Sequence, residues 1–514
     1  MKNQRHTPFW LLSAFLTVVM LLPLLFLLRN AFRSDEGALT EVFSARTWAL
    51  FSDTSLLIAA VVVLVVILAF PLAWITTRTN MPGRKVLTWL AVLPLAFPGY
   101  VMAYALLAIG GDYGMSAQLL GVAVPRLTGF WGACIALTFT LYPYLFLNLR
   151  TALLGLDPAI EESARSLGMS VQKSWFRVLL PQLRPALLAG SLLVALHVLG
   201  DFGVVSLMRY RTFSFVLYQA TEMSNAAAVA LLALIPLTMT MFMLWLEARQ
   251  LRGLRLDTSS RATKRRFRLH EMGGFKGVFF LISGLMTFLT VVLPLLCVGF
   301  WALQQNDTTN LQDLLISLWT SALVAWPAAL GAAFFALLLA YRSVRHPSRY
   351  TRIFERLSYM GYATPPIVFG LAFVAFALEV LPFLYQTLVL LIFAYIFHAL
   401  AEAIGPIRSA LFQASPRIQE VARSLGFSGF TAFRKVTFPL LKRGLLMSMA
   451  FVFLSIMKEL PITLLLAPIG FESLAMNVWQ YTANANFSAA APFALTIVLI
   501  SSVFVGLLLY REKA

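Results

Sequence analysis

Long blocks of hydrophobic residues, separated by short polar stretches, recur from one end of the chain to the other. A helix needs about 20 mostly apolar residues to cross the hydrocarbon of a bilayer. The blocks therefore predict spanning helices at 9–28, 55–77, 87–109, 129–148, 186–207, 226–246, 277–303, 313–341, 358–380, 383–404, 443–467 and 490–509. The predicted fold class is an all-α polytopic membrane protein with about 12 transmembrane helices.

Composition agrees with this prediction. Of the 514 residues, 60% are hydrophobic and only 12% are charged, whereas soluble globular chains carry about a quarter charged residues. The two cysteines, Cys134 and Cys297, both lie inside hydrophobic blocks. They indicate neither a disulfide framework nor a cysteine metal site, and we assign no metal ligands and no cofactor.

Lysine and arginine concentrate in alternate connections between the predicted spans. The rich connections include TTRTNMPGRK, the stretch from Arg150 to Arg184 and EARQLRGLRLDTSSRATKRRFR, whereas QQNDTTNLQD and GFESLAMNVWQYTANANFS have none. By the positive-inside rule the rich connections are cytoplasmic, and so are both termini. The net charge of +18 is thus explained by membrane topology, and we predict no nucleic-acid partner.

The chain also contains an internal repeat. A shift of 258 residues aligns RTALLGLDPAIEESARSLGMSVQKSWFRVLLPQL (150–183) with RSALFQASPRIQEVARSLGFSGFTAFRKVTFPLL (408–441), and 15 of the 34 positions are identical. Composition alone would give about two or three identities. We therefore predict two homologous six-helix halves, residues 1–250 and 271–514, joined by a basic cytoplasmic linker at 251–270.

Each aligned segment predicts two short helices joined at a glycine. The expected features are an N-cap, a proline in the first turn, a left-handed glycine that ends the first helix, a second N-cap and a proline that stops the second helix. These residues are Asp157, Pro158, Gly168, Ser170 and Pro181 in the first segment, and Ser415, Pro416, Gly426, Ser428 and Pro439 in the second. Lipid requires no ordered loop here, so a soluble partner is indicated. The alternative is a solvated connector in which Glu161 pairs with Arg165.

The spacing E-x-A-x-x-x-G-x(12)-P, from Glu162 to Pro181 and from Glu420 to Pro439, resembles the EAA loop of binding-protein-dependent ABC importer permeases. The resemblance implies a type I permease fold with coupling loops at 157–181 and 415–439, each docking on an ATPase. It implies that the coupling residues are Glu162, Ala164, Gly168, Pro181, Glu420, Ala422, Gly426 and Pro439. Glu161 is replaced by Gln419 in the second copy, so it receives no shared role.

The chain lacks any G-x-x-x-x-G-K-[ST] phosphate-binding motif, and no soluble stretch is long enough for a nucleotide-binding domain. We therefore expect that it is not an enzyme. If transport is ATP-driven, hydrolysis takes place on a separate subunit, present in two copies, one for each coupling loop. The resemblance also implies an extracytoplasmic substrate-binding protein and a location in the bacterial inner membrane.

The 258-residue shift also aligns two acidic residues, Asp201 in LHVLGDFGVV and Glu459 in LSIMKELPIT. Acidic residues at membrane depth usually face a cavity, a partner or a pathway, so both are candidates for lining the transport pathway. The alternative is a structural ion pair of Glu459 with Lys458 or Arg209. His197 aligns with Ser455 and is interpreted as a core histidine.

The segments PGYVMAYAL, HVLGDFGVV and MKELPITLLLAPIGFESLA are similar to those of ferric-iron importer permeases, which are often fused double-length chains. Carboxylate oxygens suit a hard cation, which agrees with this substrate. Permeases for thiamine, polyamines or phosphonates share the architecture and remain alternatives. A secondary transporter with 12 helices in two halves is a further one.

Overall fold

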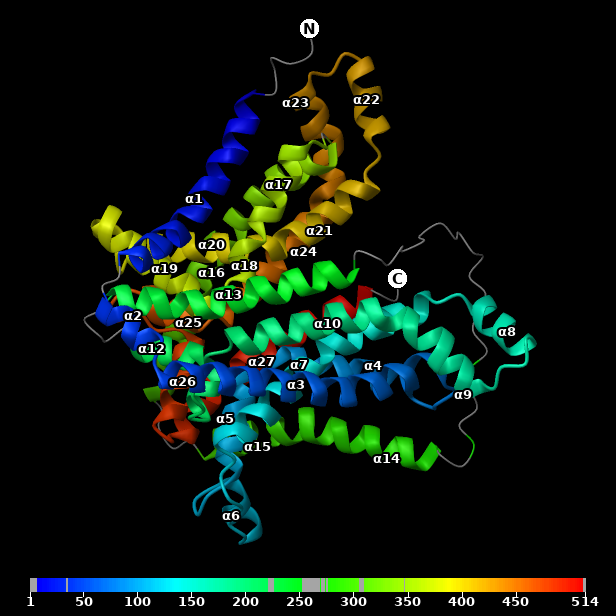
Figure 1. Cartoon of the computed structure of the whole chain (residues 1–514), viewed down its shortest axis with the longest axis vertical. Coiled ribbons are helices and arrows are strands. Elements are labelled where there is room, and N and C mark those ends of the chain that lie inside the picture. Colours follow the sequence, from blue (N-terminus) through cyan, green and yellow to red (C-terminus); the bar gives the residue numbers. More distant parts are fainter. Residues whose placement is uncertain are drawn as a thin grey trace. The chain divides into compact units, whose positions relative to one another are not determined.

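The computed structural model describes residues 7–33, 36–220, 226–251, 269, 273, 276–304, 309–345 and 347–511. Every regular element in these ranges is a helix (Figure 1). Among the described residues, eight helices are long and apolar enough to cross a membrane, or up to eleven if each of three bent pairs is one span. The predicted all-α polytopic membrane fold is confirmed. The predicted linker, 251–270, lies outside the described residues except for Leu251 and Leu269.

The helices gather into two compact units. Unit 1 comprises Met1–Ser44, Val216–Leu237 and Asp307–Asn477, and unit 2 comprises Ala45–Phe215, Thr238–Asn306 and Val478–Ala514. The units do not coincide with the predicted halves. The opening helix of the first half, α1 (Thr7–Phe32), belongs to unit 1, and α14 (Lys276–Thr287) and α15 (Leu293–Leu303), which open the second half, belong to unit 2.

Unit 2 is built on three mutually packed helices, α3 (Ala45–Arg78), α7 (Gly129–Gly155) and α10 (Leu180–Gly200). The α15 helix is fixed to α5 (Gly99–Ile109) by two bonds to backbone carbonyls. Cys297 Sγ donates to Ala105 at 3.4 Å, and Trp301 Nε1 donates to Ala108 at 3.2 Å. The Tyr104 hydroxyl donates to Phe487 at the start of α27 (Phe487–Arg511) at 3.0 Å. Opening and closing helices of the second half therefore complete this core.

Unit 1 repeats the arrangement with α16 (Thr309–Arg345), α21 (Leu400–Gln413) and α24 (Phe438–Met457). Here α1 packs on α19 (Pro366–Val380), and Arg29 forms an ion pair with Glu379. A buried apolar cluster joins the same helices to α12 (Phe213–Ala220) and α13 (Ala226–Leu251). Its members are Leu24, Leu27, Ala31, Leu217, Ala230, Ala233, Ile367, Val368, Leu371 and Ala372.

Three predicted spans are bent rather than straight, and two of them bend by more than 90°. The helical stretch Arg84–Ala96 meets Gly99–Ile109 at 93°, and Arg349–Ala363 meets Pro366–Val380 at 103°. Both bends fall at a proline, Pro98 or Pro365. Proline disfavours a helical conformation in the preceding residue, and both Phe97 (ψ 116°) and Thr364 (ψ 130°) are extended.

The sequence repeat is reproduced in the helix boundaries. The 258-residue shift superimposes α8 (Pro158–Ser166) on α22 (Pro416–Ser424), and α9 (Val171–Ser174) on α23 (Gly429–Ala432). A larger shift, 267 residues, aligns Arg78 at the end of α3 with Arg345 at the end of α16. The difference arises after α5, where the first half has the longer connection, including α6 (Met115–Leu120).

Candidate functional site

Residues 157–181, called here the first loop, and residues 415–439, the second loop, have the same conformation. Each contains two short helices, α8 and α9 or α22 and α23, and Figure 1 shows both pairs extending beyond the ends of the neighbouring long helices. Glu162 and Glu420 are exposed, whereas Ala164 and Ala422 are 6% and 5% exposed. The small residue of each pattern therefore faces inward, and the acidic residue is free to meet a partner.

The glycine of each loop has the predicted left-handed conformation. Gly168 has φ of +84° and Gly426 has φ of +89°. The backbone N–H of the next residue, Met169 or Phe427, donates at 3.2 Å to the carbonyl of Ala164 or Ala422. This is the hydrogen bond of a Schellman C-cap, which satisfies a carbonyl that the helix end would leave unpaired. The predicted left-handed conformation, which ends the first helix of each loop, is confirmed at both glycines.

The predicted N-caps form in three of four cases. Asp157 Oδ1 accepts from the Ala159 N–H at 2.9 Å. Ser170 and Ser428 accept through Oγ from the N–H three residues later, at 3.4 and 3.2 Å. Ser415 occupies the predicted N-cap position of α22 but makes no side-chain cap bond. Ser415 is exposed, and water can solvate the first N–H groups of α22 instead.

The prolines do not stop the second helix of each loop. Five residues before α10, Trp175–Leu179, form a π-helical turn, and Phe433–Thr437 form the same turn before α24. Pro181 and Pro439 then lie in the first turn of α10 and α24. A proline inside an α-helix removes one bond of the ladder and clashes with the preceding turn. The wider π turn relieves this conflict, so each loop runs directly into a spanning helix.

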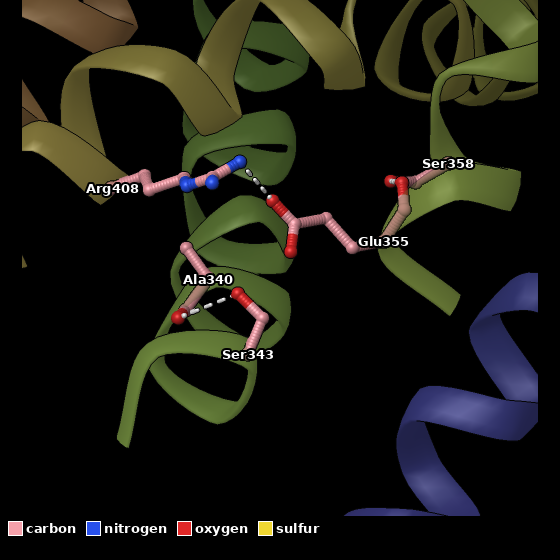
Figure 2. Close-up of polar contacts among 5 residues, drawn as sticks. All are labelled: Ala340, Ser343, Glu355, Ser358 and Arg408. Atoms are coloured by element: carbon pink, nitrogen blue, oxygen red, sulfur yellow. Dashed lines mark hydrogen bonds and ion pairs between the residues drawn. The ribbon is translucent and has the colours of Figure 1, made fainter. Parts of the chain in front are cut away.

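The helix that leads into the second loop also makes an ion pair with a neighbouring helix. Figure 2 shows Arg408 on α21 directed at the carboxylate of Glu355 on α17 (Arg349–Ser358), with Nη1 and Oε1 2.8 Å apart. The Arg408 side chain is 46% exposed and that of Glu355 is 12% exposed. A half-exposed pair of this kind contributes at most about 1 kcal/mol, so it orients α21 more than it stabilises the fold.

Asp201 and Glu459 both lie at a helix break and play the same local role. Asp201 Oδ1 accepts from the N–H groups of Val204 and Val205, at 2.9 and 3.3 Å, at the start of α11 (Gly203–Leu207). Glu459 Oε1 accepts from the Ile462 N–H at 3.2 Å, at the start of α25 (Pro461–Leu466). Each carboxylate therefore caps a short helix that follows a long spanning helix.

The surroundings of the two carboxylates differ. On the Glu459 side, Ser455 donates through Oγ to Glu402 at 3.0 Å, and Glu402 interacts electrostatically with Lys458 and Glu459. At the positions equivalent to Glu402 and Ser455, the first half has Tyr144 and His197, whose rings lie 4.7 Å apart. His197 Nδ1 is 2.8 Å from the Leu193 carbonyl, as expected for a core histidine.

Sequence reasoning missed Glu402. It lies in a predicted span, and an acidic residue at such a position was the available signal. Within the described part of the chain, no group of three His, Cys, Asp or Glu side chains is placed to hold a metal ion.

These features define a class. Two sets of spanning helices, with matching helix pairs at their ends and matching carboxylate-capped breaks, make a duplicated polytopic membrane transport subunit. The model of the family described as "binding-protein-dependent transport system inner membrane component" matches residues 66–255 and again residues 332–512. The chain belongs to this family and contains its domain twice. Both matches include the loop and carboxylate of their half, and both leave out its opening helix.

Three relatives, aligned over different shares of the chain, support the family assignment. The Fe(3+)-transport system permease protein FbpB 2 of Haemophilus influenzae is 30% identical over 515 aligned positions, which cover 98% of each chain. A probable molybdenum ABC transporter permease protein of Haloferax volcanii is 35% identical over 189 residues, 35% of this chain and 69% of its own. The sulfate transport system permease protein CysT of Salmonella typhimurium is 37% identical over 135 residues, 26% of this chain and 49% of its own.

Proposed function

We propose that this chain is the permease of an ATP-driven importer for ferric iron, delivered by an extracytoplasmic binding protein and driven by two copies of a separate ATPase subunit. The family assignment supplies the coarser statement, an ABC importer permease of the binding-protein-dependent type. The observation that carries the rest is the duplicated loop, whose helices have matching bounds at equivalent positions of the two halves. Two loops of matching structure favour binding of two copies of the same ATPase subunit.

The loop surface suits a protein partner. Leu167 and Leu425, at equivalent positions beside the glycines, are 81% and 74% exposed. Ile160 and Ile418 are a second exposed pair of equivalent residues. Large apolar side chains that recur on an exposed element mark interaction sites more often than solvated connectors. This favours docking of each loop in a groove of an ATPase, with Glu162 or Glu420 at the polar margin.

The mechanism that we propose is alternating access. With both termini and both loops in the cytoplasm, ATP binding draws the two ATPases together and moves the loops with them. The π turns join the loops to α10 and α24 without interruption, so each movement passes directly to the helix that ends at Asp201 or Glu459. A pathway formed in this way opens first toward the binding protein and then toward the cytoplasm.

Ferric iron is favoured by the relative that matches along the whole chain and by the chemistry of the carboxylates. Hard cations prefer oxygen ligands, and Asp201 and Glu459 would attract a cation and repel an oxyanion such as sulfate or molybdate. Thiamine, polyamine and phosphonate permeases remain alternatives for the cargo. A secondary transporter is set aside, because the chain belongs to a binding-protein-dependent family.

The test is reconstitution of the permease in liposomes with its ATPase and iron-loaded binding protein. We expect ATP-dependent accumulation of ferric iron that an excess of sulfate or molybdate leaves unchanged. Uptake of the oxyanion instead would overturn the substrate while leaving the permease assignment intact. Failure of the purified permease to retain any ATPase would overturn the coupling role of both loops.

A further inference from the structure

We infer that the second span of each half, α3 or α16, is a strut that positions its loop, and that Arg345 and Tyr341 are the positioning residues of the second loop. The inference rests on the proposed coupling function of the loops. Neither residue belongs to the loop motif, and both lie on a helix more than 60 residues earlier in the chain.

The last turns of α16 contact the second loop at two points and the residue just before the loop at a third. Arg345 donates through Nη2 to the carbonyl of Ala414, the residue between α21 and the loop. Tyr341 and Gln419 on α22 exchange hydrogen bonds, with Tyr341 Oη 3.2 Å from Gln419 Oε1 and 3.0 Å from Nε2. The Tyr341 ring also meets Phe433 edge-on, at 5.5 Å between centroids. The entrance, the first helix and the π turn of the loop are thus all held by one helix.

The first half repeats the aromatic part of this arrangement. The 267-residue shift places Trp74 at the position of Tyr341, and the 258-residue shift places Trp175 at that of Phe433. The Trp74 and Trp175 rings pack at 5.2 Å, and Phe70 lies 5.3 Å from Trp175. Arg78, equivalent to Arg345, is only 2% exposed. The same contact is kept in both units with different residues, as expected if the contact itself has a role.

The opposite ends of the same two helices hold the segments beyond the carboxylates. On α16, Ser321 Oγ accepts from the Leu474 N–H at 3.0 Å, and Ser317 Oγ accepts from Asn477 at 2.8 Å. On α3, Thr54 Oγ1 accepts from the Phe213 N–H at 3.3 Å. Leu474 and Phe213 are the first residues of equivalent helices, α26 (Leu474–Ala483) and α12.

Each strut therefore contacts one segment on either side of the predicted membrane. At a rise of about 1.5 Å per residue, the 37 residues of α16 extend about 55 Å. Because a hydrogen-bonded helix transmits displacement along its axis, movement at the α26 side reaches the second loop through Arg345 and Tyr341. Sequence predicts α26 in the outer connection, where a binding protein docks. The strut thus carries the loading signal to the ATPase.

The experiment compares wild-type permease with the variants Arg345→Gln and Tyr341→Phe, singly and together, in liposomes with the ATPase and the iron-loaded binding protein. Tyr341→Phe keeps the ring on Phe433 and removes only the bonds to Gln419. Three quantities are measured: ATPase retained by the purified permease, basal ATP hydrolysis, and hydrolysis stimulated by the binding protein. We expect the double variant to retain the ATPase and its basal hydrolysis. The stimulation of hydrolysis by the binding protein should fall about tenfold.

Two further variants sharpen the result. Arg345→Lys keeps a charged donor for the Ala414 carbonyl and should restore part of the stimulation, which a general loss of folding would not allow. Arg349→Gln, at an exposed arginine just beyond the strut, should behave as wild type. The inference would be overturned if the double variant kept full stimulation. It would also be overturned if Arg345→Lys restored none of the lost stimulation. Failure of the wild type to retain ATPase would instead refute the proposed function.

Discussion

The left-handed glycines offer the sharpest test of the coupling loops, because a side chain added there strains the backbone without a steric clash. A Cβ added at Gly168 or Gly426 would meet no atom within 4 Å. The penalty of an alanine is therefore conformational, about 1–2 kcal/mol for a left-handed residue with a Cβ. Such a penalty lowers the population of the folded turn, and with it the affinity for the ATPase, about 5- to 30-fold. The two loops are separate sites, so the double variant should lose about 2–4 kcal/mol.

The assay is the dissociation constant of the ATPase from purified permease in lipid nanodiscs, with membrane insertion verified by gel filtration. Gly168→Asn and Gly426→Asn serve as matched variants, because asparagine tolerates the left-handed region and should retain most of the affinity. Gly155, at the end of α7, provides the opposite control. It has the same open space for a Cβ and is absent from the positive-φ glycines, so Gly155→Ala should leave affinity unchanged. Wild-type affinity in both alanine variants would refute the role of the turns.

Three other changes separate the remaining roles. Asp201→Asn combined with Glu459→Gln should lower iron uptake in liposomes without reducing ATPase retention, and unchanged uptake would leave these residues with their capping role alone. Ser428→Ala should weaken ATPase binding through loss of a cap worth about 1 kcal/mol, whereas Ser415→Ala, which removes no cap bond, should have no effect; equal losses would contradict the cap geometry. Arg408→Ala should cost less than about 1 kcal/mol in thermal stability, and a larger loss would show that the pair with Glu355 anchors α21.

Local sequence patterns predicted the features that depend on neighbouring residues. The spans follow from length and hydrophobicity, and the glycine turns follow from the left-handed conformation that only a few residues tolerate. The duplication was decisive for the loops, since it gave two independent copies of the same spacing. Asp201 and Glu459 were found in the same way, although their shared capping of α11 and α25 became visible only in the structure.

The features that were missed depend on competition between local and distant effects. Pro181 and Pro439 suggested helix ends, but each is followed by an apolar stretch that gains more from spanning the membrane than a π turn costs. Glu402 forms a hydrogen bond with Ser455, 53 residues later, and Tyr341 forms one with Gln419, 78 residues later. Local sequence patterns do not indicate either pair. The bends at Pro98 and Pro365 were marked by prolines, but the local sequence did not predict their angles of 93° and 103°.

The exchange of opening helices has a consequence for the order of assembly. When α1 emerges from the ribosome and enters the bilayer, the surface on which it packs, α19, is still more than 300 residues from being synthesised. Arg29 therefore enters the bilayer before its ion-pair partner Glu379 has been synthesised. Covalent fusion of the halves then keeps the waiting helix tethered near its eventual neighbour at a high effective concentration. If separate genes encoded the halves, this intramolecular association would become an association between two membrane proteins. The first would contain α1 without α19, and the second would contain α15 without α5.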